Sequence, residues 1–463
     1  MRRRAAITGV AVVAMAAIPA QVAQAATITV RCSVPALVAA INTANSTPGA
    51  HILNLAGGCT YTLVAPDNAA NGLPVINSDI MINGSGSGSG PGATITRDPS
   101  APGFRILAVA STGKLTLNSA TISGGAATDC PGSDDICGGG IYNVGTLTVN
   151  HSRVISNTAT GAGGVGAVGG GGIDNDGTAT LNGAEVSGNT ASWTGTTAGF
   201  AIGGGIENDG SLAINTSRML NNTVSATAGT GSHAGGASVA NFGSATVHGS
   251  TVSDNVATAS GGIARAALAN AGTMTVTDSR ITSNTSSAQG GIATGAAVST
   301  GPFSTLTMTR VVVRRNTSSA PDGIAEGGGM GFEHDANVTI TSSVFSDNTA
   351  SAPGGTARGG GIFNGFEDGS PGNSGSLTLT DSAVSDNIAS GDTAQGGGIF
   401  NESPSTATLT RTAVTRNAAS GTTSADGGGI FNANPASVSV TLNNSRVSKN
   451  KPNNCTPPIG TCA

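Results

Sequence analysis

Residues 171–189 read GGIDNDGTATLNGAEVSGN, and residues 204–222, at a spacing of 33, read GGIENDGSLAINTSRMLNN. The two segments share a glycine pair, an Ile, an Asn two residues later, an alternating apolar and polar stretch, and a final Asn. The final Asn stands at Asn157, Asn189, Asn222, Asn255, Asn284, Asn316, Asn348, Asn387, Asn417 and Asn450. With one degenerate copy before them, these positions predict about eleven repeats of a unit of about 32 residues, a period typical of solenoids.

Each unit contains three short stretches with the pattern of a β-strand. Residues ten and eight positions before the final Asn are apolar in every copy, as at Ala179 and Leu181. This period of two indicates a strand with one buried face. The apolar residue three positions before the Asn, such as Val186, predicts a second strand, and the Ile of the glycine-rich segment, such as Ile173, predicts a third.

Coils with the same side chain at the same place stack in register, as parallel strands. We therefore predict an all-β, right-handed parallel β-helix solenoid with three short strands per coil, capped by a short N-terminal helix. Asn143, Asn175 and Asn208 predict a ladder of stacked amides. Counting back a constant distance from the final Asn puts Thr300 and Phe332 in the inward Ile column. The same count makes Pro302 and His334 the residues that interrupt the Asn ladder.

The ends of the chain differ from the repeats. Residues 2–4 are Arg, residues 5–18 are apolar, and residues 23–25 read AQA, which together predict a secretory signal peptide at residues 1–25. A membrane anchor is the alternative, but the apolar run is short for a membrane span. We expect a secreted or extracellular protein that can associate with a cell surface, without a transmembrane segment.

Beyond the signal, three regions are expected: an N-terminal cap at residues 26–75, β-helix repeats at 76–450, and a C-terminal cap at 451–463. In the first cap, Leu37, Val38, Ile41 and Ala44 have the spacing of an amphipathic helix, with Ser33 as its N-cap. This helix would cover the open end of the stack, where unpaired strands could otherwise recruit other chains.

The six cysteines form three pairs that are close in sequence. Short loops close most readily, and a secreted protein folds in an oxidising compartment. We therefore predict the disulfides Cys32–Cys59, Cys130–Cys137 and Cys455–Cys462. A zinc site is the alternative, but none of the pairs has the C-x₂-C spacing of a zinc ligand pair.

Charge argues against one class of partner. Only 10% of the residues are charged, and the net charge is −5. An acidic chain without a basic stripe is unsuited to a phosphate backbone, so we expect no nucleic-acid partner. Polysaccharide or a cell-surface glycan is the expected ligand class, and a monomer is the expected state.

The repeated GGGI(Y/F)N and SxNxA segments resemble the repeats of chlamydial polymorphic outer-membrane proteins and the wider class of pectin-lyase-like β-helix proteins. The opening CSVPALVAAINTAN, residues 32–45, is similar to the N-terminal cap of secreted bacterial CSLREA-domain proteins, although the REA core is replaced. The resemblance covers residues 30 to about 450 and implies a β-helix with an adhesive or cell-surface role.

One cluster of acidic residues stands out from the weakly charged repeats. Asp174 aligns with Glu207, and Asp176 with Asp209, on two neighbouring coils. Carboxylates stacked in this way raise one another's pKa or recruit a cation, and oxygen ligands on rigid strands suit Ca²⁺. Three interpretations stay open: a solvated acidic patch, a Ca²⁺ site formed by these four residues, and a carboxylate site that cleaves carbohydrate.

Two smaller clusters contain charged or titratable side chains. Glu333, His334 and Asp335 are consecutive, with a structural role favoured over a general base, and Arg310, Arg314 and Arg315 could bind an anionic sugar.

Two functions compete. We expect a non-catalytic binding, adhesion or structural scaffold that requires no cofactor, and we assign no catalytic residue. The alternative is a polysaccharide lyase or glycoside hydrolase on the same fold. Such enzymes use aromatic sugar platforms, and this chain has one Trp and two Tyr.

Overall fold

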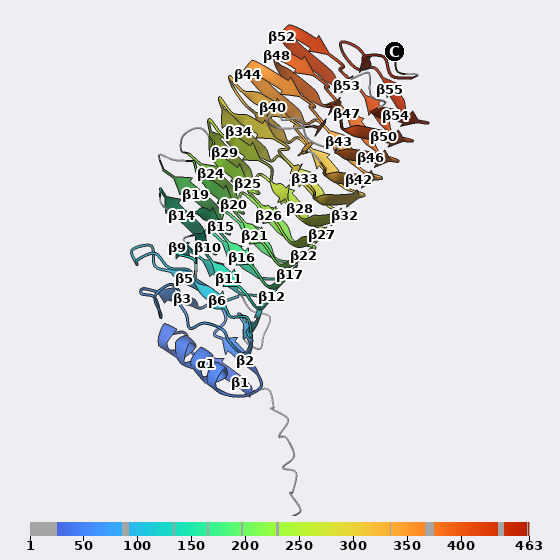
Figure 1. The fold of residues 1–463 in the computed structure, drawn as a ribbon. Helices are drawn as coiled ribbons and strands as arrows, with labels where there is room; N and C mark the ends of the chain where they lie inside the picture. Colours follow the sequence, from blue (N-terminus) through green and yellow to red (C-terminus); the bar gives the residue numbers. More distant parts are fainter. Residues whose placement is uncertain are drawn as a thin grey trace, which may run out of the picture.

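The computed structural model describes residues 26–85, 92–131, 133, 135–163, 166–195, 198–227, 231–333, 335–365, 375–433, 439–460 and 462. These residues form an elongated stack of strands, with the helix α1 (Val34–Ser46) at one end and the C-terminus at the other (Figure 1). The architecture is a parallel β-helix of about 12 turns, as predicted. The predicted signal peptide at residues 1–25 and His334 lie outside the described residues.

A single coil shows how the sequence pattern becomes structure. Its strands β16 (Ile173–Asn175), β17 (Thr178–Asn182) and β18 (Glu185–Ser187) are the three that the sequence predicts. The structure adds two more, β19 (Thr190–Thr194) and β20 (Phe200–Ile202), between the final Asn and the next glycines. These two strands lead out from the coil and back to it, and together with their copies they form an arm along the rod.

The strands form four parallel sheets of 14, 17, 12 and 13 strands. The 12-stranded sheet carries the predicted Asn ladder and is called the ladder sheet. It consists of β6 (Leu107–Val109), β11 (Ile141–Asn143), β16, β21 (Ile206–Asn208), β26 (Val239–Asn241), β31 (Leu268–Asn270), β36 (Val298–Thr300), β41 (Met330–Phe332), β45 (Ile362–Asn364), β49 (Ile399–Asn401), β53 (Ile430–Asn432) and β56 (Cys455–Thr456).

The 17-stranded sheet forms the arm. Its strands that lead back toward the ladder sheet are called the return strands. They are β10 (Ile136–Cys137), β15 (Ala167–Gly169), β20, β25 (His233–Gly235), β30 (Ile263–Arg265), β35 (Ile292–Thr294), β40 (Ile324–Glu326), and the last residues of β44 (Thr349–Arg358), β48 (Ile388–Gln395) and β52 (Ala418–Asp426).

The predicted Asn ladder is present on the ladder sheet. Asn143 Nδ2 donates to Asn175 Oδ1, and Asn175 Nδ2 to Asn208 Oδ1, each at 2.6 Å. The predicted register is wrong in two coils, where Val298 pairs with Met330 and Thr300 pairs with Phe332. Thr300 and Phe332 thus take the ladder position and not the inward Ile position, and Pro302 is not part of the ladder. In each of these two coils four residues separate the ladder strand from the next strand, against two after β16 and β21, so counting back from the final Asn misplaces them by two residues.

The final Asn of each unit forms a second ladder inside the coil. Asn189 is fully buried, its Nδ2 donates to Asn222 Oδ1 at 3.0 Å and to the Val154 carbonyl oxygen at 2.9 Å, and its Oδ1 accepts from the Asn157 backbone at 3.0 Å. These bonds satisfy backbone groups at the turn where the chain enters the arm. The recurrence of this Asn in every repeat therefore reflects a structural requirement of the turn.

Two separate hydrophobic cores fill the molecule. The aliphatic columns of the three predicted strands form the main core. The arm has its own core, made almost entirely of Ala, with Trp193 as its one large side chain at 1% exposure. Alternation of Ala with Ser, Thr and Gly has little hydrophobic contrast, so the strands of the arm are hard to recognise in the sequence.

The predicted helix α1 packs against the N-terminal end of the stack. Ser33 caps α1 by accepting from the Ala36 backbone N–H, and Leu37, Ile41 and Ala44 are buried against the first coils. The structure contains the disulfides Cys32–Cys59, Cys130–Cys137 and Cys455–Cys462. Among the described residues, no helix has the length and apolar character needed to cross a membrane.

Candidate functional site

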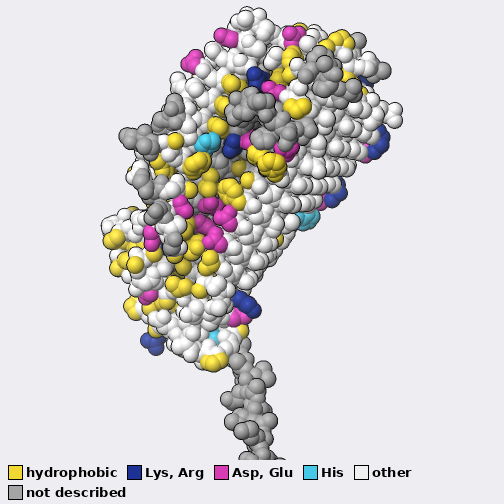
Figure 2. All heavy atoms as spheres, in the orientation of Figure 1, with side chains coloured by type: hydrophobic (Ala, Val, Ile, Leu, Met, Phe, Trp, Pro, Cys, Tyr) yellow, Lys and Arg dark blue, Asp and Glu magenta, His cyan; other side chains and the backbone are white. Residues whose placement is uncertain are grey.

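A groove runs along the rod where the return strands of the arm approach the ladder sheet. Side chains of both line two neighbouring hollows in it. Figure 2 shows acidic and hydrophobic side chains gathered along one stripe of a face that is otherwise largely uncharged and polar. The outward positions of the ladder sheet and the side chains of the return strands supply this stripe, so the arm creates the groove.

The first hollow has a volume of about 280 Å³ and contains all four acids singled out in the sequence. Asp174 on β16 pairs in register with Glu207 on β21, and Asp176 and Asp209 follow these strands. Asp135, just before β10 in the arm, adds a fifth carboxyl group. We call this site, formed by Asp135, Asp174, Asp176, Glu207 and Asp209, the acidic hollow.

The carboxyl groups lie at different depths. Asp174 is 5% exposed, Glu207 is half-buried, and Asp176 and Asp209 are exposed at the rim. A solvated patch that splays into water would expose all of them. The groove instead encloses the two acids on the strands and leaves the two acids after the strands open to solvent.

Enclosure alters the protonation of three of these groups. Burial raises the pKa of Asp174 well above its ordinary value, and the charges of Asp176 and Asp209 raise it further. Burial likewise raises the pKa of Glu207 well above its ordinary value, with Asp174 as the largest charge contribution. The pKa of Asp209 is raised by burial and by Asp176. The hollow therefore favours protonated carboxyl groups or a bound cation over four bare charges.

A buried arginine lies beneath the acids. Arg105 is fully buried and donates to the Asp129 carboxylate at 3.1 Å and to the Asn71 side chain at 3.2 Å. Its guanidinium lies 5.6 Å from the ring centre of Tyr142, and the Tyr142 hydroxyl donates to Asp176 at 2.8 Å. The positive charge of Arg105 opposes the upward shift of the Asp174 pKa. Arg105 precedes the first complete repeat, so no recurring pattern in the sequence singles it out.

A metal ion needs several ligand atoms close to one another. Among the described residues, the group whose candidate ligand atoms all lie within 4.8 Å is Cys130, Cys137 and Asp174. Both sulfur atoms are in a disulfide and are not thiolate ligands. The carboxylates proposed for Ca²⁺ share one hollow, but as the side chains stand they do not form such a group.

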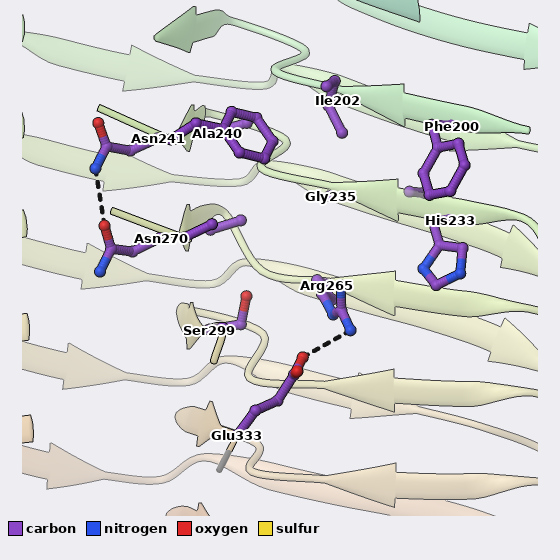
Figure 3. Close-up of a pocket in the computed structure, with 15 residues that line it drawn as sticks. Phe200, Ile202, His233, Gly235, Ala240, Asn241, Arg265, Asn270, Ser299 and Glu333 are labelled. Carbon is purple, nitrogen blue, oxygen red and sulfur yellow. Dashed lines mark hydrogen bonds and ion pairs between the residues drawn. The ribbon is translucent and has the colours of Figure 1, made fainter. Parts of the chain in front are cut away.

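The second hollow, of about 170 Å³, lies a short distance farther along the groove. Phe200 and His233 stack on the arm side with ring centres 5.0 Å apart, and Phe242 lines the ladder-sheet side. Arg265 Nη2 contacts Glu333 Oε1 at 2.6 Å (Figure 3). We call this site, formed by Phe200, His233, Phe242, Arg265 and Glu333, the apolar hollow.

A third group of charges lies beyond the apolar hollow. Arg358 Nη1 is 3.4 Å from Glu326 Oε1 and 3.9 Å from Glu402 Oε1, and its guanidinium lies 5.4 Å from the ring centre of Phe400. Phe400 in turn stacks between Phe363 and Phe431 on the ladder sheet. Glu326, Phe363 and Phe400 are at most 2% exposed, so this group lies mostly beneath the surface.

The remaining candidates from the sequence have different positions. Glu333 belongs to the apolar hollow, and its neighbour His334 lies outside the described residues. Arg310 binds Asp278 with two hydrogen bonds of 2.6 and 2.7 Å, and Arg314 contacts Asp347 at 2.8 Å. Neither arginine lines a hollow, and each already has a carboxylate partner, so the structure does not prepare them for an anionic sugar.

Comparison with known proteins gives few matches. No protein-family model and no curated protein matches the chain. The crystal structure of the Dettilon tailspike protein (gp208) is similar over 88% of this chain and 64% of that chain, at 9% identity and a TM-score of 0.33. The crystal structure of pectate lyase Pel9A is similar over 95% of this chain and 81% of that chain, at 12% identity and a TM-score of 0.27. The chain therefore spans less than two thirds of the tailspike chain.

Proposed function

We propose that this protein is a secreted, monomeric β-helix that binds an extended polysaccharide or cell-surface glycan along its groove without cleaving it. The observation that carries the proposal is that the acidic hollow and the apolar hollow share one coil and follow one another along the rod. A linear polymer can contact both hollows at once. The carboxylates repel phosphate groups, which argues against a nucleic acid.

Glycoside hydrolysis is the second candidate, favoured by one observation. Asp174 and Glu207 have raised pKa values and lie beside the exposed Asp176. A protonated carboxyl group can donate a proton to the leaving oxygen of a glycosidic bond, while a carboxylate activates a water molecule or attacks the sugar. In this alternative Asp174 or Glu207 is the acid and Asp176 is the base.

A weak Ca²⁺ site in the acidic hollow is compatible with either function. Five carboxyl groups face a confined space, and Asp174 and Glu207 are destabilised as bare anions. Ca²⁺ is bound by carboxylate oxygens and would compete with protons for them. We propose Asp174, Asp176, Glu207 and Asp209 as its ligands, after rotation of their side chains toward a common point.

The experiment combines binding with product analysis. The purified mature chain is incubated with neutral, acidic and amino polysaccharides, in EDTA and in Ca²⁺, and affinity, new reducing ends and unsaturated products are measured. Binding without new ends supports the binding function. New ends that are lost in Asp174→Asn, but not in the exposed turn variant Asp254→Asn, support hydrolysis. Absence of binding to every glycan contradicts the proposed function.

A further inference from the structure

We propose that the apolar hollow is a subsite for one uncharged sugar ring, next to the residue of the glycan that lies over the acidic hollow. The inference deepens the proposed function and rests on it, because it assigns the chemical class of the ligand. It is carried by the exposed aromatic rings of the hollow, by its internally neutralised charge and by its position beside the acids.

The aromatic rings of this hollow are unusually exposed. Phe200 and Phe242 are 48% and 45% exposed, although most Phe side chains in the described residues are buried. They come from opposite walls, since Phe200 lies on the return strand β20 and Phe242 follows the ladder strand β26. The face of an aromatic ring carries partial negative charge and attracts the polarised C–H groups on the face of a sugar ring. Both rings line the same hollow, so one sugar ring placed in it can contact both.

The polar groups of the hollow suit hydroxyl groups better than a charged group. Arg265 reaches from β30 to Glu333, which follows β41 two coils farther along, and the two charges neutralise each other (Figure 3). Arginine N–H groups donate and carboxylate oxygens accept, so the pair can bind hydroxyl groups that do both. A uronate carboxylate would have to compete with Glu333 for Arg265 and would lie beside its negative charge.

The acidic hollow adds a second argument against an acidic ligand. Both hollows share one coil, since Phe200 on β20 lines the apolar hollow and Glu207 on β21 lines the acidic hollow. Adjacent coils are about 4.8 Å apart, so a sugar in one hollow is within a residue or two of the other. Successive uronates would meet this group of acids, whereas uncharged sugars meet only hydrogen-bond acceptors and proton donors.

The test compares uncharged cello-, xylo-, manno- and chito-hexasaccharides with hexagalacturonate by calorimetry in EDTA at low salt. We expect wild type to bind at least one uncharged ligand more tightly than hexagalacturonate. In Phe242→Ala that affinity should fall by about 3- to 10-fold, the loss expected for one aromatic contact. Phe303→Ala removes a Phe that is 77% exposed and lines neither hollow, and it should leave the affinity unchanged.

The outcomes separate this inference from the proposed function. If wild type binds an uncharged hexasaccharide and Phe242→Ala binds it equally well, the subsite assignment is wrong and the glycan-binding function stands. If hexagalacturonate binds more tightly than every uncharged ligand and Arg265→Gln abolishes that preference, the ligand class is wrong. If no ligand binds to wild type, both proposals fail. A crystal soaked with the tightest ligand should show a sugar ring against Phe242.

Discussion

The carboxylate of Glu207 lies directly against the backbone of Gly169. A Cβ atom on Gly169 would be only 1.4 Å from Glu207 Oε2, so any larger residue at position 169 must displace this side chain. Gly169 and Glu207 belong to neighbouring coils, on the arm and on the ladder sheet. The absence of one side chain on the arm thus gives room to one carboxylate of the acidic hollow.

Gly169→Ala should therefore change the site more than the fold. The displaced atom is the end of a flexible side chain, so we expect a loss of less than about 1 kcal/mol in unfolding free energy. Glycan binding or Ca²⁺ binding that uses Glu207 should weaken clearly. Gly163→Ala is the control, because its new Cβ would have no neighbour within 4 Å and Gly163 lines neither hollow. Equal ligand affinity in wild type and Gly169→Ala would show that the position of Glu207 is irrelevant to binding.

The raised pKa values of the acidic hollow predict that the folded chain is less stable at neutral than at mildly acidic pH. Asp174 and Glu207 bind protons more tightly in the folded than in the unfolded chain, so their contribution to stability falls as the pH rises from the ordinary carboxyl range through the raised values. Asp174→Asn with Glu207→Gln should raise the Tm at pH 7 in EDTA and flatten its pH dependence. A double variant that melts below wild type at pH 7 would contradict this prediction.

Glu185 should show the opposite pH dependence. Arg218 and Arg153 contact its carboxylate at 2.7 and 3.0 Å, and with Ser187 they lower its pKa to about 2 despite partial burial. Its contribution is present at neutral pH and is lost as the pH falls through the folded value. Both arginines are more than half exposed, so solvent screens the ion pairs and Glu185→Gln should cost about 1 kcal/mol at pH 7. Urea unfolding at pH 7 and pH 3 measures this, and a larger loss at pH 3 would overturn it.

Ca²⁺ should stabilise the folded chain if the acidic hollow binds it. An unfolded chain does not hold the four carboxylates together, so millimolar Ca²⁺ should raise the Tm relative to EDTA by simple linkage. Mg²⁺ at the same concentration controls for ionic strength. No Ca²⁺-dependent shift in wild type, or a full shift in Asp174→Asn with Glu207→Gln, would rule out this site.

The two kinds of Asn in one coil should differ greatly in their contribution to stability. Asn189→Ala leaves the buried backbone N–H of Asn157 without its acceptor and the Val154 carbonyl oxygen without its side-chain donor, so it should cost about 2–4 kcal/mol. Asn182→Ala in the same coil removes a half-buried amide that bonds to Asn150 and that water can replace. It should cost less than about 1 kcal/mol. Similar losses for both variants, measured by urea unfolding, would refute the structural role of the inner ladder.

Much of the fold follows from the sequence by itself. The alternation at Ala179 and Leu181, the ladder residue Asn175 and the α1 cap Ser33 all reflect interactions between neighbours in one coil or between equal positions in adjacent coils. Such interactions recur with the period of the repeat, and a recurring pattern can be read without coordinates. For the same reason, the four aligned acids could be assigned to one face.

The tertiary structure alone decided that this face is a groove. The arm that encloses Asp174 alternates Ala with small polar residues, a pattern with little hydrophobic contrast. The register at Thr300 and Phe332 depends on turn length. Asp135 joins the other acids, and Phe200 and Phe242 line one hollow, only because the arm folds back over the ladder sheet. Contacts between the arm and the ladder sheet join positions that are not equivalent in the repeat. Periodicity therefore determines the stacking of the coils, whereas the path of the arm determines which side chains meet in the groove.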